Sequence, residues 1–126
     1  MATWKELSLD SLAAAKELMT AGHWRSSASR SYYAVYARVC QVLSRLTEFP
    51  EGREGPSHDD LPDMLFDYLT RLTVAERRRF ASVVYRMYQR RVTADYRPSR
   101  TIDELGARDS MTSAQAFFTA MEAVYE

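Results

Sequence analysis

The chain has 126 residues, of which 46% are hydrophobic, and its 17 basic and 17 acidic side chains cancel to a formal net charge of zero. This length is enough for one hydrophobic core and too short for two ordinary domains, so we predict a single domain over residues 1–126. The zero net charge excludes a global attraction to nucleic acid. Any such binding must come from a local basic patch, such as the stretch between Arg86 and Arg97.

The charged residues near the N-terminus and the single cysteine indicate in which cellular compartment the protein is found. Charged side chains recur through the first 25 positions and interrupt the apolar stretch that a signal peptide or membrane span needs. Cys40 cannot form an internal disulfide and lies among apolar residues, as a reduced core thiol does. We therefore expect a cytoplasmic protein that makes no contact with a membrane.

The first two predicted elements are helices joined by a tight turn. Apolar residues at helical spacing predict a helix over about residues 8–20, and Gly22 follows it as a suitable left-handed cap. The second predicted helix covers about residues 24–46 and carries two apolar lines. A helix that is apolar on more than one side is typical of the centre of a bundle.

Glycine and proline mark the segment that follows. Residues 47–57 contain few apolar side chains and four breakers, which predicts a surface loop; the breakers are Pro50, Gly52, Gly55 and Pro56. A short third helix is predicted next, with Asp59 or Asp60 as its N-cap. Its expected core-facing residues are Leu61, Leu65, Tyr68 and Leu69.

The fourth predicted helix has a clear start and a clear end. Thr73 and Glu76 have the spacing of a capping box, in which each side chain bonds the other residue's amide. The helix must end by Arg97, because Pro98 disfavours helical geometry in the residue before it.

The fifth predicted helix starts either at a second capping box, Thr101 to Glu104, or after Gly106 at Ser110. Its predicted buried face consists of Met111, Ala114, Phe117, Phe118, Met121 and Tyr125. No segment of useful length alternates as a strand does. We therefore predict an all-α fold, an antiparallel up-and-down bundle of four to five helices.

Arg91 interrupts the apolar pattern of the fourth helix. It continues the stripe of Phe80, Val84 and Met87, which would face the core. A guanidinium in apolar surroundings needs a carboxylate, a water-filled cleft, a subunit interface or an anionic ligand. Asp95 lies one helical turn further and shares a face with Arg91, so a structural ion pair and a ligand site both remain open.

Familiar catalytic motifs are absent from the sequence. The glycines are scattered, no serine has a nucleophile-elbow context, and His23 and His58 lack the spacing of a metal site. We therefore expect neither a metal nor an organic cofactor.

Three short motifs resemble the HEPN domain family, in particular its small stand-alone branch. They are Gly22-His23-Trp24 followed by Arg30-Ser31-Tyr32-Tyr33-Ala34, then His58 at the head of a helix, then Arg91-Val92-Thr93-Ala94-Asp95-Tyr96. The resemblance covers nearly the whole chain, and the order and spacing of the motifs make it fairly specific.

The resemblance implies a homodimer with the motif helices around a cleft, and often a nucleotidyltransferase partner in a toxin–antitoxin-like two-gene system. Many members of the family cut RNA without metal, using an arginine and a histidine four to six residues later. The arginine offsets the charge of the phosphorane, and the histidine moves the 2′-hydroxyl proton. Here Tyr96 follows Arg91 where that histidine would stand, and a phenol with a pKa of about 10 is a poor base at neutral pH.

Two functions therefore remain open for this chain. In the first, it is a metal-independent endoribonuclease in which Arg91 holds the phosphate, while Asp95, Tyr96 or His58 handles protons. In the second, the same cleft only binds a nucleotide, an RNA segment or the partner protein.

Three further residues are expected to bind the ligand in either case, namely Arg30, Tyr33 and Arg90. A homodimeric scaffold without a ligand is a third reading of the same features.

Overall fold

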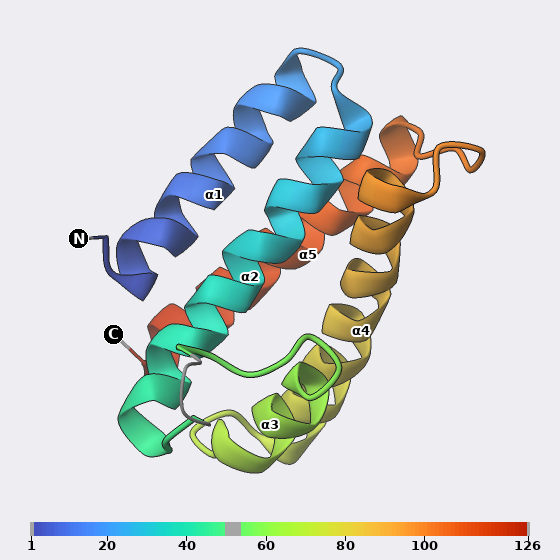
Figure 1. Cartoon of the computed structure of the whole chain (residues 1–126). Coiled ribbons are helices and arrows are strands. Elements are labelled where there is room, and N and C mark those ends of the chain that lie inside the picture. The colour runs from blue at the N-terminus through green and yellow to red at the C-terminus, as the bar shows by residue number, and fades with distance from the viewer. Residues whose placement is uncertain (1, 50–53, 126) are drawn as a thin grey trace.

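The computed structural model describes residues 2–49 and 54–125, and α-helices make up most of these ranges (Figure 1). The helices are α1 (Trp4–Thr20), α2 (Trp24–Leu46), α3 (Leu61–Tyr68), α4 (Val74–Tyr96) and α5 (Glu104–Val124). The helices α1 and α4 run in one direction, α2 and α5 run in the other, and the short α3 packs beside α4. The described ranges contain no strand. The predicted all-α antiparallel bundle is confirmed.

The central element is α2, which packs against each of the other four helices. Figure 1 shows α1 along one side of α2 and α4 along the other, with α5 behind. The side chains of Val35, Val39 and Leu43 on α2 are fully buried in the core. Ala37 and Cys40 of the second apolar line are buried as well, so this helix is buried on more than one side, as the sequence predicts.

Capping residues explain where α1 begins and ends. The hydroxyl of Thr3 accepts a hydrogen bond from the amide of Glu6, so α1 starts at Trp4, earlier than the predicted Ser8. At the other end Gly22 has φ of 80°, and the amides of Gly22 and His23 donate to carbonyl oxygens of the last turn. This is a Schellman cap, and it confirms the predicted role of the glycine.

The helix α4 begins with the predicted capping box. The hydroxyl of Thr73 accepts from the amide of Glu76 at 3.1 Å, and the Glu76 carboxylate accepts from the amide of Thr73 at 2.9 Å. Both orphan amides at this terminus are thereby satisfied. The helix ends at Tyr96 with Arg97 as its C-cap, as Pro98 requires.

Two details of α3 and α5 were predicted incorrectly. The N-cap of α5 is Asp103, whose carboxylate accepts from the amide of Gly106 at 2.9 Å, so Thr101 forms no capping box and Gly106 is helical. In α3 the side chain of Tyr68 is 38% exposed, because the helix ends there and Leu69 enters the core instead. The predicted buried face of α5 is confirmed.

The loop before α3 packs on α2 rather than lying wholly at the surface. Gly55 and Pro56 are buried, and the Tyr36 hydroxyl donates to the Pro56 carbonyl at 2.7 Å. Pro50 and Gly52 lie outside the described residues. This packing fixes the backbone that leads to His58.

Across the part of the chain that is described, no helix is both long and apolar enough to cross a membrane.

Candidate functional site

Arg91 lies on the inner side of α4, and its side chain is only 12% exposed. Its Nε lies 3.1 Å from an oxygen of Asp95, and its terminal amino group donates to the hydroxyl of Tyr33. Its guanidinium carbon lies 5.1 Å from the ring centroid of Tyr33 and 5.2 Å from that of Tyr96. The buried charge therefore has the carboxylate partner that the spacing predicts and two phenol rings beside it.

The helix α2 completes this group of side chains. The hydroxyl of Ser29 donates to Asp95 at 3.0 Å, and the guanidinium of Arg30 lies 4.7 Å from the ring centroid of Tyr33. Two cations thus contact one ring. We call the group formed by Arg30, Tyr33, Arg91, Asp95 and Tyr96 the arginine cluster.

His58 reaches the neighbourhood of the arginine cluster from the loop before α3. Its Nδ1 lies 2.7 Å from the hydroxyl of Tyr32, and its ring stacks on Tyr88 with centroids 5.4 Å apart and planes 8° apart. Its ring centroid is also 4.7 Å from that of Tyr36 and 6.0 Å from that of Tyr33. The imidazole therefore lies among four tyrosines, one of which belongs to the arginine cluster.

The surroundings of His58 favour its neutral form. Burial lowers the pKa of His58, and the positive charge of Arg91 lowers it further, against an opposing effect of Asp59. Burial also raises the pKa of Tyr32 well above its ordinary value, so this phenol keeps its proton. In the tautomer that carries its proton on Nδ1, this nitrogen donates to the Tyr32 oxygen, and the unprotonated Nε2 is left to accept a proton from a substrate.

His58 also lines a cleft of about 480 Å³, which we call the aromatic cleft; Tyr33 is not among its lining residues. The other residues that line it include the aromatic Trp4, Tyr36 and Tyr88 and the acidic Glu54 and Asp59, and it shares Trp4 and Glu54 with a neighbouring opening. The imidazole thus stands between an acidic, ring-lined cleft and a cluster of two cations.

Arg90 points away from the arginine cluster. One of its amino groups lies 2.9 Å from both the carboxylate of Asp109 and the hydroxyl of Ser110, on α5. Burial alone would raise the pKa of Asp109, but the hydrogen bond from Arg90 and the charges of Arg86 and Arg90 lower it. Arg90 therefore joins α4 to α5. The other predicted residues gather around Tyr33, and the functional role of each stays a prediction.

Four side chains around the site were not among the predicted site residues, although Tyr32 belongs to the motif that carries the family resemblance. They are Ser29, Tyr32, Tyr36 and Tyr88. A signal for them exists in the spacing. Ser29, Tyr32 and Tyr36 recur at steps of three and four along α2, and Tyr88 precedes Arg91 by three residues on α4, so each set shares a helix face. What the spacing lacks is the information that these two faces meet around His58.

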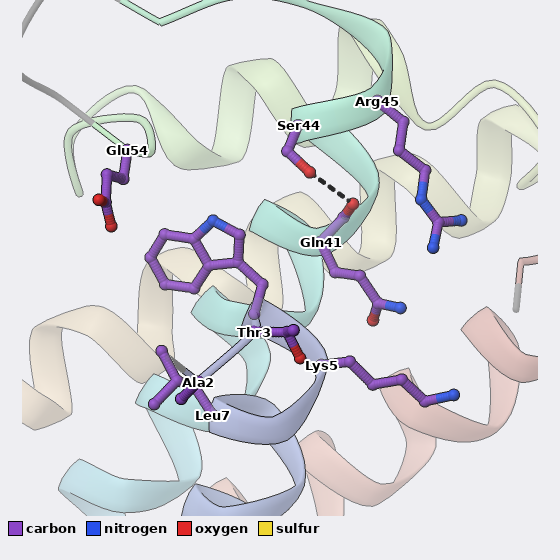
Figure 2. A pocket seen from close by; sticks show the side chains of 9 residues that line it. Ala2, Thr3, Lys5, Leu7, Gln41, Ser44, Arg45 and Glu54 are labelled. Carbon is purple, nitrogen blue, oxygen red and sulfur yellow. Dashed lines mark hydrogen bonds between the residues drawn. The ribbon is translucent and has the colours of Figure 1, made fainter.

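A second opening, shown in Figure 2, lies where the start of α1 meets the end of α2 and has a volume of about 500 Å³. Lys5, Gln41 and Arg45 line it, and the Ser44 hydroxyl donates to the carbonyl of Gln41 at 2.9 Å. None of the predicted site residues lines this opening. We therefore place the candidate site at the arginine cluster and His58.

Comparisons with curated proteins and with solved structures found no match. A comparison with protein-family models gives a match to the HEPN domain over residues 1–124. This match covers the whole helical bundle, including the arginine cluster and His58. The chain therefore belongs to the HEPN domain family.

Proposed function

We propose that this HEPN domain is a metal-independent endoribonuclease and the effector of a toxin–antitoxin-like two-gene system. Its site is the arginine cluster together with His58. One observation carries the proposal: a histidine from a different element lies against Tyr33, the same ring that Arg91 contacts. The chain thus has an arginine and a histidine in one site although Tyr96 stands where the family's histidine follows its arginine.

The arginine cluster supplies the positive charge that phosphate needs. Arg91 and Arg30 both contact Tyr33, so two guanidinium groups lie at one ring, where we propose that the phosphate binds. A cation near the phosphorane stabilises the charge that develops there, and partial burial strengthens the interaction. Tyr96 is 66% exposed at the rim, where its ring suits stacking with a base better than proton transfer.

His58 is suited to the proton transfer. In the proposed reaction the 2′-oxygen attacks the adjacent phosphorus while Nε2 of a neutral imidazole takes the 2′-hydroxyl proton, and the bond to the 5′-oxygen breaks as that oxygen takes a proton from water. The low pKa of His58 keeps it neutral, and Tyr32 holds its ring in place through Nδ1. Tyr32 is a positioning residue in this scheme.

A second copy of the chain would complete the cleft in this proposal. Tyr96 and Tyr85 are 66% and 57% exposed on α4, which gives this helix aromatic surface for a partner. A homodimer would bring two arginine clusters to one interface. A nucleotidyltransferase antitoxin would then act by covering or modifying that interface.

The experiment measures RNA cleavage in the presence of EDTA, together with growth on expression. We expect the wild-type protein to cut RNA and slow growth, Arg91→Ala and His58→Ala to lose both effects, and Arg91→Lys to retain part of them. His23→Ala is the matched control, because His23 is an exposed residue at the start of α2. Intact RNA with wild-type protein at high concentration would rule out the nuclease.

A non-catalytic binding module is the second candidate, and the Arg91–Asp95 pair favours it. A carboxylate 3.1 Å from Nε already neutralises the cation, which suits reversible binding of an anion. In this case RNA or a nucleotide binds without being cut, the affinity falls steeply with salt, and Arg91→Ala abolishes binding.

A further inference from the structure

The aromatic cleft and the arginine cluster are neighbours with opposite chemistry. The cleft has a volume of about 480 Å³ and two carboxylates in its wall, whereas the cluster presents two guanidinium groups. His58 lines the cleft and also lies against Tyr33 of the cluster. A ligand that spans both would be anionic at one end and would donate hydrogen bonds at the other.

The rings that line the cleft come from α1, α2, α4 and the loop before α3. Trp4 meets Tyr36 edge to face, with centroids 6.0 Å apart and planes at 76°, while His58 stacks on Tyr88. Such walls suit a flat ligand, because nucleobases stack favourably on aromatic side chains. The ring content therefore points to a base rather than to a second phosphate.

The two carboxylates restrict which base fits. Glu54 and Asp59 have no hydrogen-bond or ion-pair partner within residues 2–49 and 54–125, and both side chains are exposed. A carboxylate only accepts hydrogen bonds, so the ligand edge that it holds must donate. Cytosine, adenine and guanine carry an exocyclic amino group with two N–H donors, which suits two carboxylates, whereas uracil has no exocyclic amino group and donates only through its single ring N3–H.

We propose that the aromatic cleft binds a nucleobase with an exocyclic amino group and so selects cytosine, adenine or guanine over uracil. The phosphate of the same nucleotide lies at the arginine cluster. This inference rests on the proposed function, because it names the base beside the phosphate that Arg91 holds.

The test uses free nucleosides, which carry no phosphate and require neither Arg91 nor cleavage. Cytidine and uridine differ at the exocyclic group that the cleft is expected to read. Trp4 lines the aromatic cleft and also the opening in Figure 2, so a shift of its indole N–H resonance is assigned to the cleft only if Tyr88→Ala, which alters the cleft alone, reduces it. The resonance of Trp24 is an internal control, since Trp24 lies against Gly22 at the turn between α1 and α2. We expect cytidine to shift the Trp4 resonance alone and to bind about tenfold more tightly than uridine.

Substitutions test which side chains distinguish cytidine from uridine. The double variant Glu54→Gln with Asp59→Asn should bind cytidine and uridine equally, while Asp63→Asn should keep the preference. Asp63 is a matched control because its exposed carboxylate lies in the first turn of α3, outside the cleft. Tyr88→Phe keeps the ring and should bind cytidine normally, whereas Tyr88→Ala should bind it more weakly.

The inference and the proposed function fail in distinguishable ways. Equal affinity for cytidine and uridine, an unshifted Trp4 resonance, or an arginine-containing peptide that occupies the cleft in place of nucleosides would overturn the inference. RNA that is bound and cut without base preference would overturn the inference alone. Nucleoside discrimination by a protein that neither binds nor cuts RNA would support the base site and overturn the proposed function.

Discussion

His58 and Tyr88 stack with their planes 8° apart, so a loop residue is held against α4 by one ring contact. The tyrosines around the imidazole bury part of it, and this burial together with the charge of Arg91 lowers the pKa of His58. The fold therefore binds a proton at this position less well than the unfolded chain does. A group of this kind makes stability depend on pH.

We expect the free energy of unfolding to fall as the pH drops below about 6.5, the ordinary pKa of histidine, because the unfolded chain then takes up a proton at His58 that the folded chain resists. This contribution is fully present above pH 6.5. Urea denaturation from pH 5 to 8 measures it. The slope should be shallower in His58→Gln and unchanged in His23→Gln; equal slopes in all three proteins would contradict the burial of His58.

Arg90 and Arg91 are adjacent in sequence and should have different effects. Arg90→Ala removes the contacts with Asp109 and Ser110 and should lower the free energy of unfolding by about 1–3 kcal/mol while RNA affinity stays close to wild type. Arg91→Ala should lower RNA affinity about tenfold or more. Thermal unfolding and RNA titration of both variants check this. Loss of RNA binding in a folded Arg90→Ala protein would place Arg90 in the site after all.

Arg25 should hold the end of α4 in place. Its guanidinium donates to the carbonyl oxygens of Thr93, Arg97 and Arg100 at 3.3, 2.7 and 2.7 Å. A cation at a helix C-terminus also complements the helix dipole. We expect Arg25→Ala to cost about 1 kcal/mol of stability and to speed amide hydrogen exchange over residues 93–100.

The control for Arg25 is Arg78→Ala, because Arg78 is exposed at the other end of α4. Uniform exchange rates over residues 93–100 in wild type and Arg25→Ala would show that the three contacts do not order this segment. Asp95 and Tyr96 lie within residues 93–100, so we expect RNA affinity to fall when Arg25→Ala makes this segment less ordered.

Gly55 should tolerate no side chain. A Cβ atom there would lie 2.9 Å from the hydroxyl of Tyr36 and 3.0 Å from the sulfur of Cys40, so the loop that leads to His58 would have to move. We expect Gly55→Ala to lower the free energy of unfolding by about 1–3 kcal/mol. Gly106→Ala is the control, since the nearest atom to its Cβ would lie 3.4 Å away and the residue is helical. Equal melting temperatures for the two variants would contradict the close packing at Gly55.

The fold was largely predictable because its determinants are local. The capping box at Thr73 and the glycine at residue 22 set helix ends through contacts within a few residues, and the double apolar face of α2 gave its central position. The start of α5 was ambiguous because two local capping signals lie close together. Thr101 and Asp103 are both good caps, and only the geometry of the preceding turn selects Asp103.

The candidate site was predictable only in part. The spacing of Arg91 and Asp95 on one helix gave their ion pair correctly. The environment of His58 depends on contacts with α2 and α4 that are distant in sequence, so no local pattern indicates that this histidine is surrounded by tyrosines. Helical geometry predicts that Arg90 and Arg91 point in different directions. It does not predict that Arg90 contacts Asp109 and Ser110 on α5.

The contact between Ser29 and Asp95 has a consequence for any anion that enters the site. Ser29 holds the Asp95 carboxylate near Arg91, so this carboxylate competes with any incoming anion for the Arg91 guanidinium. An incoming phosphate gains only the difference between its attraction to the guanidinium and that of the resident carboxylate. Removing the negative charge of Asp95 should therefore tighten anion binding at Arg91.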